Sequence, residues 1–304
     1  MIITNLLHIL EMEKIDFFYK GKKNINVTSI SPIYDISENG MSFWNKSNTE
    51  FPKNVRYNSN IVIIAKVETY SYGINYIFVE NPRSVFFHLL NKIPCYYPIN
   101  DIDIYSSNVC IHSKSTIGKN SFISEETKMG ECINIGNNVT ISGRVILGDN
   151  VTIESGARIG VDSCSFYVLN GKRYKVPHFA GVIIGNNVFI GANTVIEKGT
   201  LCDTFIGNNV GISALCSIGH NTKIFDNVSI TGGCTIAGSV TLKNGCRIHP
   251  NSSIGQGIEV GTGSLVGIGS NVIENVGDGE IVVGNPARFL RYVSDEDKQK
   301  FPLL

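Results

Sequence analysis

The chain has 304 residues, with 26 basic and 26 acidic side chains, so its formal net charge is zero. This balance argues against a surface built for nucleic acid or for an anionic membrane. Residues 1–16 lack the basic start and apolar core of a secretory signal, and no apolar run reaches membrane-spanning length. We therefore expect a cytoplasmic protein without stable membrane insertion.

Residues 1–100 predict a small α/β domain. A largely apolar stretch after Thr4 predicts a short helix with Thr4 as its N-cap. The apolar runs at 60–65 and 76–79 predict strands. The pair Asn81–Pro82 predicts the cap and the first position of a second helix.

From near residue 105 the sequence repeats every six residues. Every sixth residue from Ile206 to Val272 is a branched aliphatic residue. The same period occurs in two earlier blocks, Ile111–Ile159 and Ile184–Ile196. Gly or Asn recurs between these positions, and both residue types accept the positive φ of tight corners. Each unit is therefore one short strand and one corner, and three units close a triangular coil. The pattern predicts a mainly β fold, a left-handed parallel β-helix over 101–284.

The repeat is interrupted twice. A loop at 161–181 carries Lys172, Arg173 and Tyr174, and its local positive charge suits a phosphate, although a solvated loop is the alternative. Four extra residues enter between Ile196 and Ile206. Insertions leave a solenoid at its corners, often on the binding face.

The eight cysteines show no spacing typical of a metal site, so we predict no metal. Cys216, Cys234 and Cys246 fall in the channel of small inward residues, where a free thiol packs as a small hydrophobic group.

His220 is the candidate base. It lies two residues after the inward Ile218, so its side chain is expected to project outward near a corner. A lone outward histidine is more often structural than catalytic. The surrounding sequence favours the catalytic interpretation.

The chain resembles the N-acyltransferase family that acts on UDP-3-acyl-glucosamine in lipid A synthesis. The resemblance is carried, in order, by KVPHFAGVIIGNNVFIGANTVIEKGTLCDTFIGNN, CSIGHN and ITGGCTIAGS. The segments SISPIYDISENGMSFW and FVENPRSVFFHLLNK resemble that family's uridine-binding module. The match covers most of the chain, and residues 1–100 are then expected to bind the nucleotide sugar.

The resemblance implies that His220 is the general base and that the backbone N–H of Gly238 stabilises the oxyanion. It also implies a homotrimer with active sites between neighbouring β-helices. The substrate contacts expected from the resemblance and from the basic loop are Phe43, Trp44, Asn45, Lys172, Arg173, Tyr174, His178 and Asn221.

The chain departs from the family at three points, the third of which is its C-terminal segment. Ser213 stands where the family has an Asp that orients the catalytic histidine, and Glu197 or Asp203 is a possible substitute. The segment around Phe43 also differs, so the nucleotide is either UDP or dTDP.

Residues 285–304 differ from the long helical end of the family and resemble the closing segment of hexapeptide acetyltransferases that use acetyl-CoA. Arg288 or Arg291, together with Gly238, would then lie by the CoA. The alternative is a cap, with a short helix starting at Ser294.

We therefore expect an enzyme that transfers an acyl group, most simply acetyl from acetyl-CoA, to the amine of a nucleotide-linked amino sugar for surface polysaccharide. The alternatives are a lipid A N-acyltransferase that uses acyl carrier protein and an O-acetyltransferase. A metal lyase of the hexapeptide carbonic anhydrase type and a non-catalytic solenoid are further alternatives.

Overall fold

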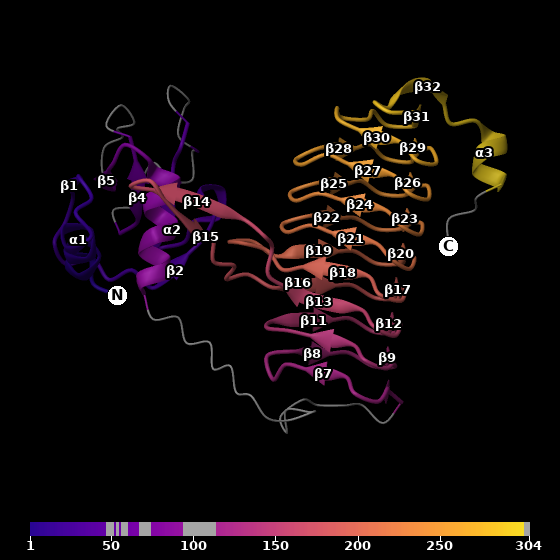
Figure 1. The fold of residues 1–304 in the computed structure, drawn as a ribbon, viewed down its shortest axis with the longest axis horizontal. Helices are drawn as coiled ribbons and strands as arrows, with labels where there is room; N and C mark the ends of the chain where they lie inside the picture. The colour runs from indigo at the N-terminus through magenta and orange to yellow at the C-terminus, as the bar shows by residue number, and fades with distance from the viewer. Residues whose placement is uncertain (47–51, 53–54, 56–59, 67–73, 94–113, 301–304) are drawn as a thin grey trace. The chain divides into compact units, whose positions relative to one another are not determined.

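A computed structural model describes residues 1–46, 52, 55, 60–66, 74–93 and 114–300. The chain forms two compact units, which Figure 1 shows in ribbon form. One comprises Met1–Ile99 with Cys164–Pro177, and the other comprises Asn100–Ser163 with His178–Leu304. None of the helices among the described residues has the length and apolar character needed to cross a membrane.

The first unit is built on a five-stranded sheet with the order β1-β5-β4-β3-β2. Strand β1 is antiparallel to β5, and the other neighbours are parallel. The strands are β1 (Phe18–Lys20), β2 (Ser29–Ile30), β3 (Gly40–Phe43), β4 (Val62–Ala65) and β5 (Asn75–Phe78), and a 3₁₀ turn, η1, spans Ile33–Asp35. The two apolar runs predicted as strands correspond to β4 and β5.

Helices α1 (Ile3–Met12) and α2 (Pro82–Lys92) begin differently. Helix α1 has Ile2 at its N-cap with no side-chain cap, so the prediction of Thr4 as the cap is wrong. The cap of α2 follows the prediction, because the Asn81 side chain accepts a hydrogen bond from the N–H of Ser84 at 3.3 Å, with Pro82 at the first position.

The loop predicted at 161–181 contains an antiparallel hairpin, β14 (Phe166–Leu169) and β15 (Lys172–Lys175), which belongs to the first unit. Tyr167 is 2% exposed, and its hydroxyl lies 3.2 Å from His88 Nδ1 and 2.9 Å from Asn91 Nδ2 on α2. The sequence placed this loop within the β-helix domain, and the structure differs because an apolar, hydrogen-bonded face docks the hairpin on α2.

The second unit is the predicted parallel β-helix, whose strands form three sheets (Figure 1) that are parallel throughout except for the pairing of β31 with β32. The eight-stranded sheet contains β7 (Phe122–Ile123), β10 (Thr140–Ile141), β13 (Arg158–Val161), β18 (Val195–Glu197), β21 (Ser217–Ile218), β24 (Thr235–Ile236), β27 (Ser253–Ile254) and β30 (Asn271–Val272). The seven-stranded sheet contains β8 (Lys128–Met129), β11 (Val145–Leu147), β16 (Val182–Ile184), β19 (Thr204–Ile206), β22 (Lys223–Ile224), β25 (Thr241–Leu242) and β28 (Glu259–Val260). The ten-stranded sheet contains β6 (Thr116–Ile117), β9 (Asn134–Ile135), β12 (Thr152–Ile153), β17 (Phe189–Ile190), β20 (Gly211–Ile212), β23 (Ser229–Ile230), β26 (Arg247–Ile248), β29 (Leu265–Val266), β31 (Glu280–Val283) and β32 (Arg288–Tyr292).

The six-residue periodicity produces one continuous aliphatic core. The branched residues at every sixth position are buried across the stacked coils, from Ile123 to Val272. Corners such as Asn209 and Asn227 have φ of 54° and 60°, as the recurrent Asn and Gly predict. The inward hydroxyl of Thr222 is hydrogen-bonded, since Thr222 Oγ1 donates to the carbonyl of Ala237 at 3.1 Å.

Strand β32 pairs antiparallel with β31 after the last coil, and α3 (Asp295–Lys300) follows it. The hydroxyl of Ser294 accepts the N–H of Asp297 at 3.2 Å, so Ser294 starts this helix as predicted.

Candidate functional site

His220 lies at the corner that follows β21 of the β-helix, where its side chain is half-buried. The ring of His178 meets it edge to face, with 5.7 Å between the ring centroids. The structure therefore brings together two histidines that are far apart in the sequence. Both had been assigned to the site from sequence.

The Nε2 edge of His220 faces Gly238, which occupies the equivalent corner after β24. A Cβ atom at Gly238 would lie 2.6 Å from His220 Nε2, so a residue without a side chain is required to admit the imidazole. Among the described residues, the backbone N–H of Gly238 has no hydrogen-bond acceptor. A basic nitrogen and an available amide donor therefore lie side by side in successive coils.

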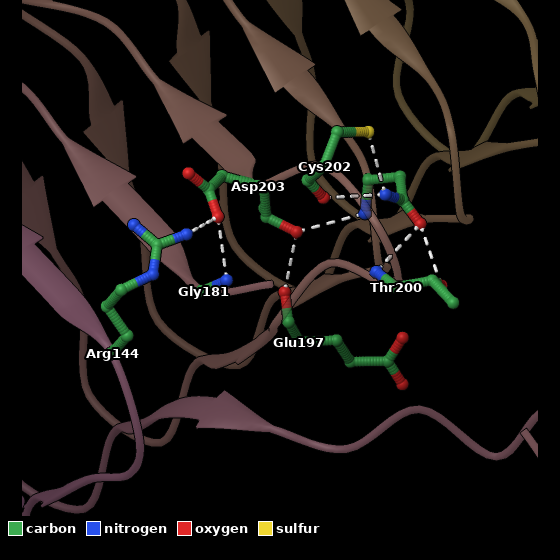
Figure 2. A network of polar contacts seen from close by, with 8 residues as sticks. Arg144, Gly181, Glu197, Thr200, Cys202 and Asp203 are labelled. Atoms are coloured by element: carbon green, nitrogen blue, oxygen red, sulfur yellow. Dashed lines mark hydrogen bonds and ion pairs between the residues drawn. The ribbon is translucent and has the colours of Figure 1, made fainter. Parts of the chain in front are cut away.

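The opposite edge of His220 contacts Asn221, because Nδ1 lies 2.8 Å from Asn221 Oδ1. Neither acid considered from sequence touches the imidazole. Glu197 Oε2 instead accepts the backbone N–H of His220 at 3.0 Å. Asp203 pairs with Arg144 and accepts the N–H of Gly181 at 2.7 Å, as Figure 2 shows.

The four inserted residues before β19 hold Asn221 in place. Thr200 donates its N–H and its hydroxyl to Asn221 Oδ1, at 3.2 and 3.0 Å. Asn221 Nδ2 donates to the carbonyl oxygen of Cys202 at 2.7 Å. Thr204 Oγ1 accepts a hydrogen bond from the Asn221 N–H at 3.0 Å, and the same hydroxyl donates to the Glu197 carbonyl. The irregular insertion is thus a rigid support for the residue that contacts the imidazole.

Sequence reasoning had placed Asn221 among the substrate contacts, and the structure shows its amide engaged within the protein. It gave no role to Thr200, and for Cys202 it left open a catalytic role that no neighbouring residues supported. The signal for them was the insertion of four residues in an otherwise regular six-residue repeat.

The inward cysteines are packed, as predicted. Cys216 and Cys234 are 2% and 0% exposed, and their thiols donate to the carbonyls of Thr231 and His249 at 3.3 and 3.1 Å. The interaction between the neighbouring thiols lowers the pKa of Cys216 and raises that of Cys234. Burial raises the pKa of Cys246 to about 12. In the part of the chain that the structure describes, no three side chains of His, Cys, Asp or Glu cluster as metal ligands would.

The nucleotide contacts predicted in the first unit differ in exposure. Trp44 is 5% exposed and belongs to the core beneath the sheet, whereas Asn45 is exposed. Phe43 is half-buried against Phe86 and Phe87, with ring centroids 5.1 and 5.8 Å away.

The basic residues of the hairpin lie on β15. Lys172 is exposed, and the Arg173 guanidinium stacks 3.8 Å from the centroid of Phe166. Tyr174 stacks on Tyr167 with 5.3 Å between ring centroids, so it helps to dock the hairpin on α2.

The two arginines proposed to meet CoA lie on β32. Arg291 forms a bidentate ion pair with Asp297, at 2.5 and 3.0 Å. The Arg288 side chain is exposed, and among the described residues its only acceptor is the Ala287 carbonyl at 2.9 Å. Arg288 is therefore the more available of the two for a phosphate.

The fold and this corner site define a hexapeptide-repeat β-helix protein with a histidine base candidate. No protein-family model matches the chain. Proteins named UDP-3-O-acylglucosamine N-acyltransferase are its relatives by sequence, which confirms the resemblance. One of Legionella pneumophila strain Paris is 44% identical over 165 residues, 52% of this chain and 48% of that protein. One of Hydrogenovibrio crunogenus is 27% identical over 250 residues, 74% of this chain and 70% of that protein.

Coverage of these relatives is partial. A second Legionella pneumophila protein, from strain Philadelphia 1, is 51% identical over 79 residues, and the chain spans only 23% of its length. Among solved structures, LpxA from Acinetobacter baumannii superposes with a TM-score of 0.55 at 22% identity, covering 66% of this chain and 78% of that one. UDP-N-acetylglucosamine acyltransferase from Campylobacter jejuni gives 0.50 at 23% identity, covering 64% and 81%. These structures establish the fold.

Proposed function

We propose that the protein is an N-acyltransferase that moves an acyl group from a thioester to the amine of a UDP-linked amino sugar. The observation that carries the proposal is the placement of His220 Nε2 against Gly238. General-base catalysis and oxyanion stabilisation are the two functions that acyl transfer to an amine requires, and here the groups for both are adjacent. The names of the sequence relatives supply the class of acceptor.

The reaction proceeds by direct attack. The amine nitrogen adds to the thioester carbonyl while His220 Nε2 takes its proton, and the Gly238 N–H faces the oxyanion of the tetrahedral intermediate. The intermediate collapses, the C–S bond breaks, and the thiolate leaves with the proton from the imidazolium. A C–N bond has replaced the C–S bond, so the products are an amide and a free thiol.

We further propose a short acyl group delivered by CoA, most simply acetyl. The exposed Arg288 guanidinium at the end of the β-helix supports this donor, because guanidinium groups bind phosphates well. The second candidate is a lipid A enzyme that takes an acyl chain from acyl carrier protein. The acceptor in the relatives' names, UDP-3-O-acylglucosamine, favours that reaction. The proposal of a homotrimer is supported by the family resemblance. The proposal of a dTDP-linked acceptor is supported by the altered segment at Phe43.

The test is a matrix of donors and acceptors. Acetyl-CoA, longer acyl-CoAs and acyl carrier protein thioesters are each incubated with UDP- and dTDP-linked amino sugars and with UDP-3-O-acylglucosamine. Thiol release is followed together with the mass of the sugar product. A product that resists hydroxylamine is an amide, whereas an ester is cleaved. Acetyl-CoA turnover yielding an amide supports the proposal, and turnover with acyl carrier protein alone supports the second candidate. Ester formation, or no transfer with any pair, would overturn both.

A further inference from the structure

The imidazole of His220 is held by an amide and not by a carboxylate. His220 Nδ1 lies 2.8 Å from Asn221 Oδ1, within hydrogen-bond distance. Other titratable side chains around this ring are His178, whose ring centroid is 5.7 Å away, and Glu197, which accepts the backbone N–H of His220 at 3.0 Å. The contact at Nδ1 therefore comes from a neutral side chain.

The neighbours of Asn221 fix which end of its amide faces His220. The oxygen and nitrogen of an Asn side chain are assigned from their partners. The Thr200 N–H can only donate, and it lies 3.2 Å from the atom that faces His220. The Cys202 carbonyl can only accept, and it lies 2.7 Å from the other atom. The atom facing the imidazole is therefore the amide oxygen, because the reversed amide would break both bonds.

An amide oxygen accepts hydrogen bonds and donates none, so Nδ1 of His220 must carry the proton. In the neutral imidazole the lone pair then resides on Nε2, the nitrogen that faces Gly238. We propose that Asn221, held by the inserted loop through Thr200 and Cys202, is a positioning residue that fixes His220 in the Nδ1–H tautomer. Asn221 thus takes the orienting role for which the resemblance led us to expect an acid, and the kinetic consequence of this assignment depends on the proposed function.

The choice of an amide has an electrostatic consequence. A carboxylate against Nδ1–H stabilises the protonated ring and raises the pKa of a histidine, whereas a neutral amide orients the ring without adding a charge. Asn221 therefore supplies the geometry of a catalytic dyad without the negative charge. Replacing it by Asp is expected to shift the acidic limb of kcat/KM upward by about one pH unit or more.

The tautomer can be read without any substrate. Protein labelled with ¹⁵N in the histidine rings is studied by NMR at pH about 8.5, two units above the ordinary histidine pKa, and the His220 signals are identified by their loss in His220→Ala. We expect a protonated Nδ1 and an unprotonated Nε2 in the wild type, and a mixture of tautomers in Asn221→Gly. Glycine suits the substitution because Asn221 has a φ of 60°.

The matched control is Asn227→Gly. Asn227 is another corner residue with a φ of 60°, and its amide oxygen accepts from Asn209 Nδ2 at 3.3 Å. This variant should keep the wild-type His220 signals. A wild-type ring protonated at Nε2, or an unchanged tautomer in Asn221→Gly, would overturn the inference whatever the enzyme's activity.

Kinetics then connect the tautomer with the reaction. Asn221→Gly should lower kcat about 10- to 100-fold with little change in KM, since a misdirected base loses catalysis and not binding. Asn227→Gly should retain its activity. If the tautomer is as proposed but His220→Ala keeps full transfer activity, the proposed function of His220 fails while the structural assignment stands. If kcat is unchanged in Asn221→Gly although the tautomer is lost, Asn221 has no positioning role in catalysis.

Discussion

Adding one methyl group at Gly238 tests the geometry of the site most sharply. The Cβ of Gly238→Ala would lie 2.6 Å from Nε2 and 2.9 Å from two carbons of the His220 ring. An ordinary contact between such atoms needs about 3.5 Å, so the ring must retreat by about 0.9 Å. A displacement of about 1 Å in a catalytic group can cost about 10²-fold in rate, or about 2.7 kcal/mol of transition-state stabilisation. We expect kcat to fall by that factor while the Gly238 N–H remains in place.

Gly232→Ala is the matched control. Gly232 also lies two residues after an inward isoleucine, but its added Cβ would contact only the Ala214 carbonyl, at 3.4 Å. Neither glycine has a positive φ, so neither substitution strains the backbone, and urea unfolding of both variants checks that each retains the β-helix. The double variant Gly238→Ala with His220→Ala should be no slower than His220→Ala alone, since both changes act on one group. Full activity in Gly238→Ala, or additive losses in the double variant, would refute the contact as the basis of catalysis.

Three further predictions concern stability. Leu215 has a φ of 61°, which strains a residue that carries a Cβ, and it is 68% exposed. Leu215→Gly should therefore stabilise the β-helix by about 1 kcal/mol, measured as a higher urea midpoint. A lower midpoint would contradict this. Tyr167→Phe removes the hydroxyl that bonds to α2 and should cost the first unit about 1–3 kcal/mol, seen as faster proteolysis of the hairpin; unchanged cleavage would refute it. The ion pair with Arg291 lowers the pKa of Asp297, so this pair stabilises the C-terminal segment above the ordinary carboxyl pKa near 4, and the stabilisation is lost as pH falls below it. Tyr292 fluorescence should report this change, and Asp297→Asn should abolish its pH dependence.

The β-helix could be predicted because its signal is local and repeated. Each six-residue unit places a branched aliphatic residue inward and a corner residue outward, as at Ile218 and Asn227, and every coil buries its neighbours' apolar edges. The second helix of the first unit was predictable for the same reason, because Asn81 and Pro82 act within their own turn.

The packing of the inserted hairpin on α2 could not be predicted, because it depends on contacts between residues that are far apart in sequence. Tyr167 reaches residues on α2 that lie 76 and 79 positions earlier. The basic residues of the loop, such as Lys172, are exposed and were evident from composition. The aromatic side chains that pack the hairpin on α2 were not recognised as a docking face. Composition therefore did not predict the packed hairpin, and substrate binding by its basic residues stays a prediction.

The chemistry of the site was half predictable. His220 and Gly238 follow from segment resemblance, and the structure places them in contact. The partner of Nδ1 did not follow, because sequence reasoning looked for an acid. It is the adjacent Asn221, whose direction is set by a four-residue insertion that no periodic pattern describes.

The central claim is that His220 removes the proton from an attacking amine. The most direct measurement compares the rate of amide formation at saturating substrate in the wild type, His220→Ala and His249→Ala. His249 is a half-buried histidine at a different corner of the β-helix, so it serves as the control. The account predicts a loss of about 10²–10⁴-fold in His220→Ala alone, with sugar binding preserved. Wild-type turnover in His220→Ala, or an equal loss in His249→Ala, would contradict it.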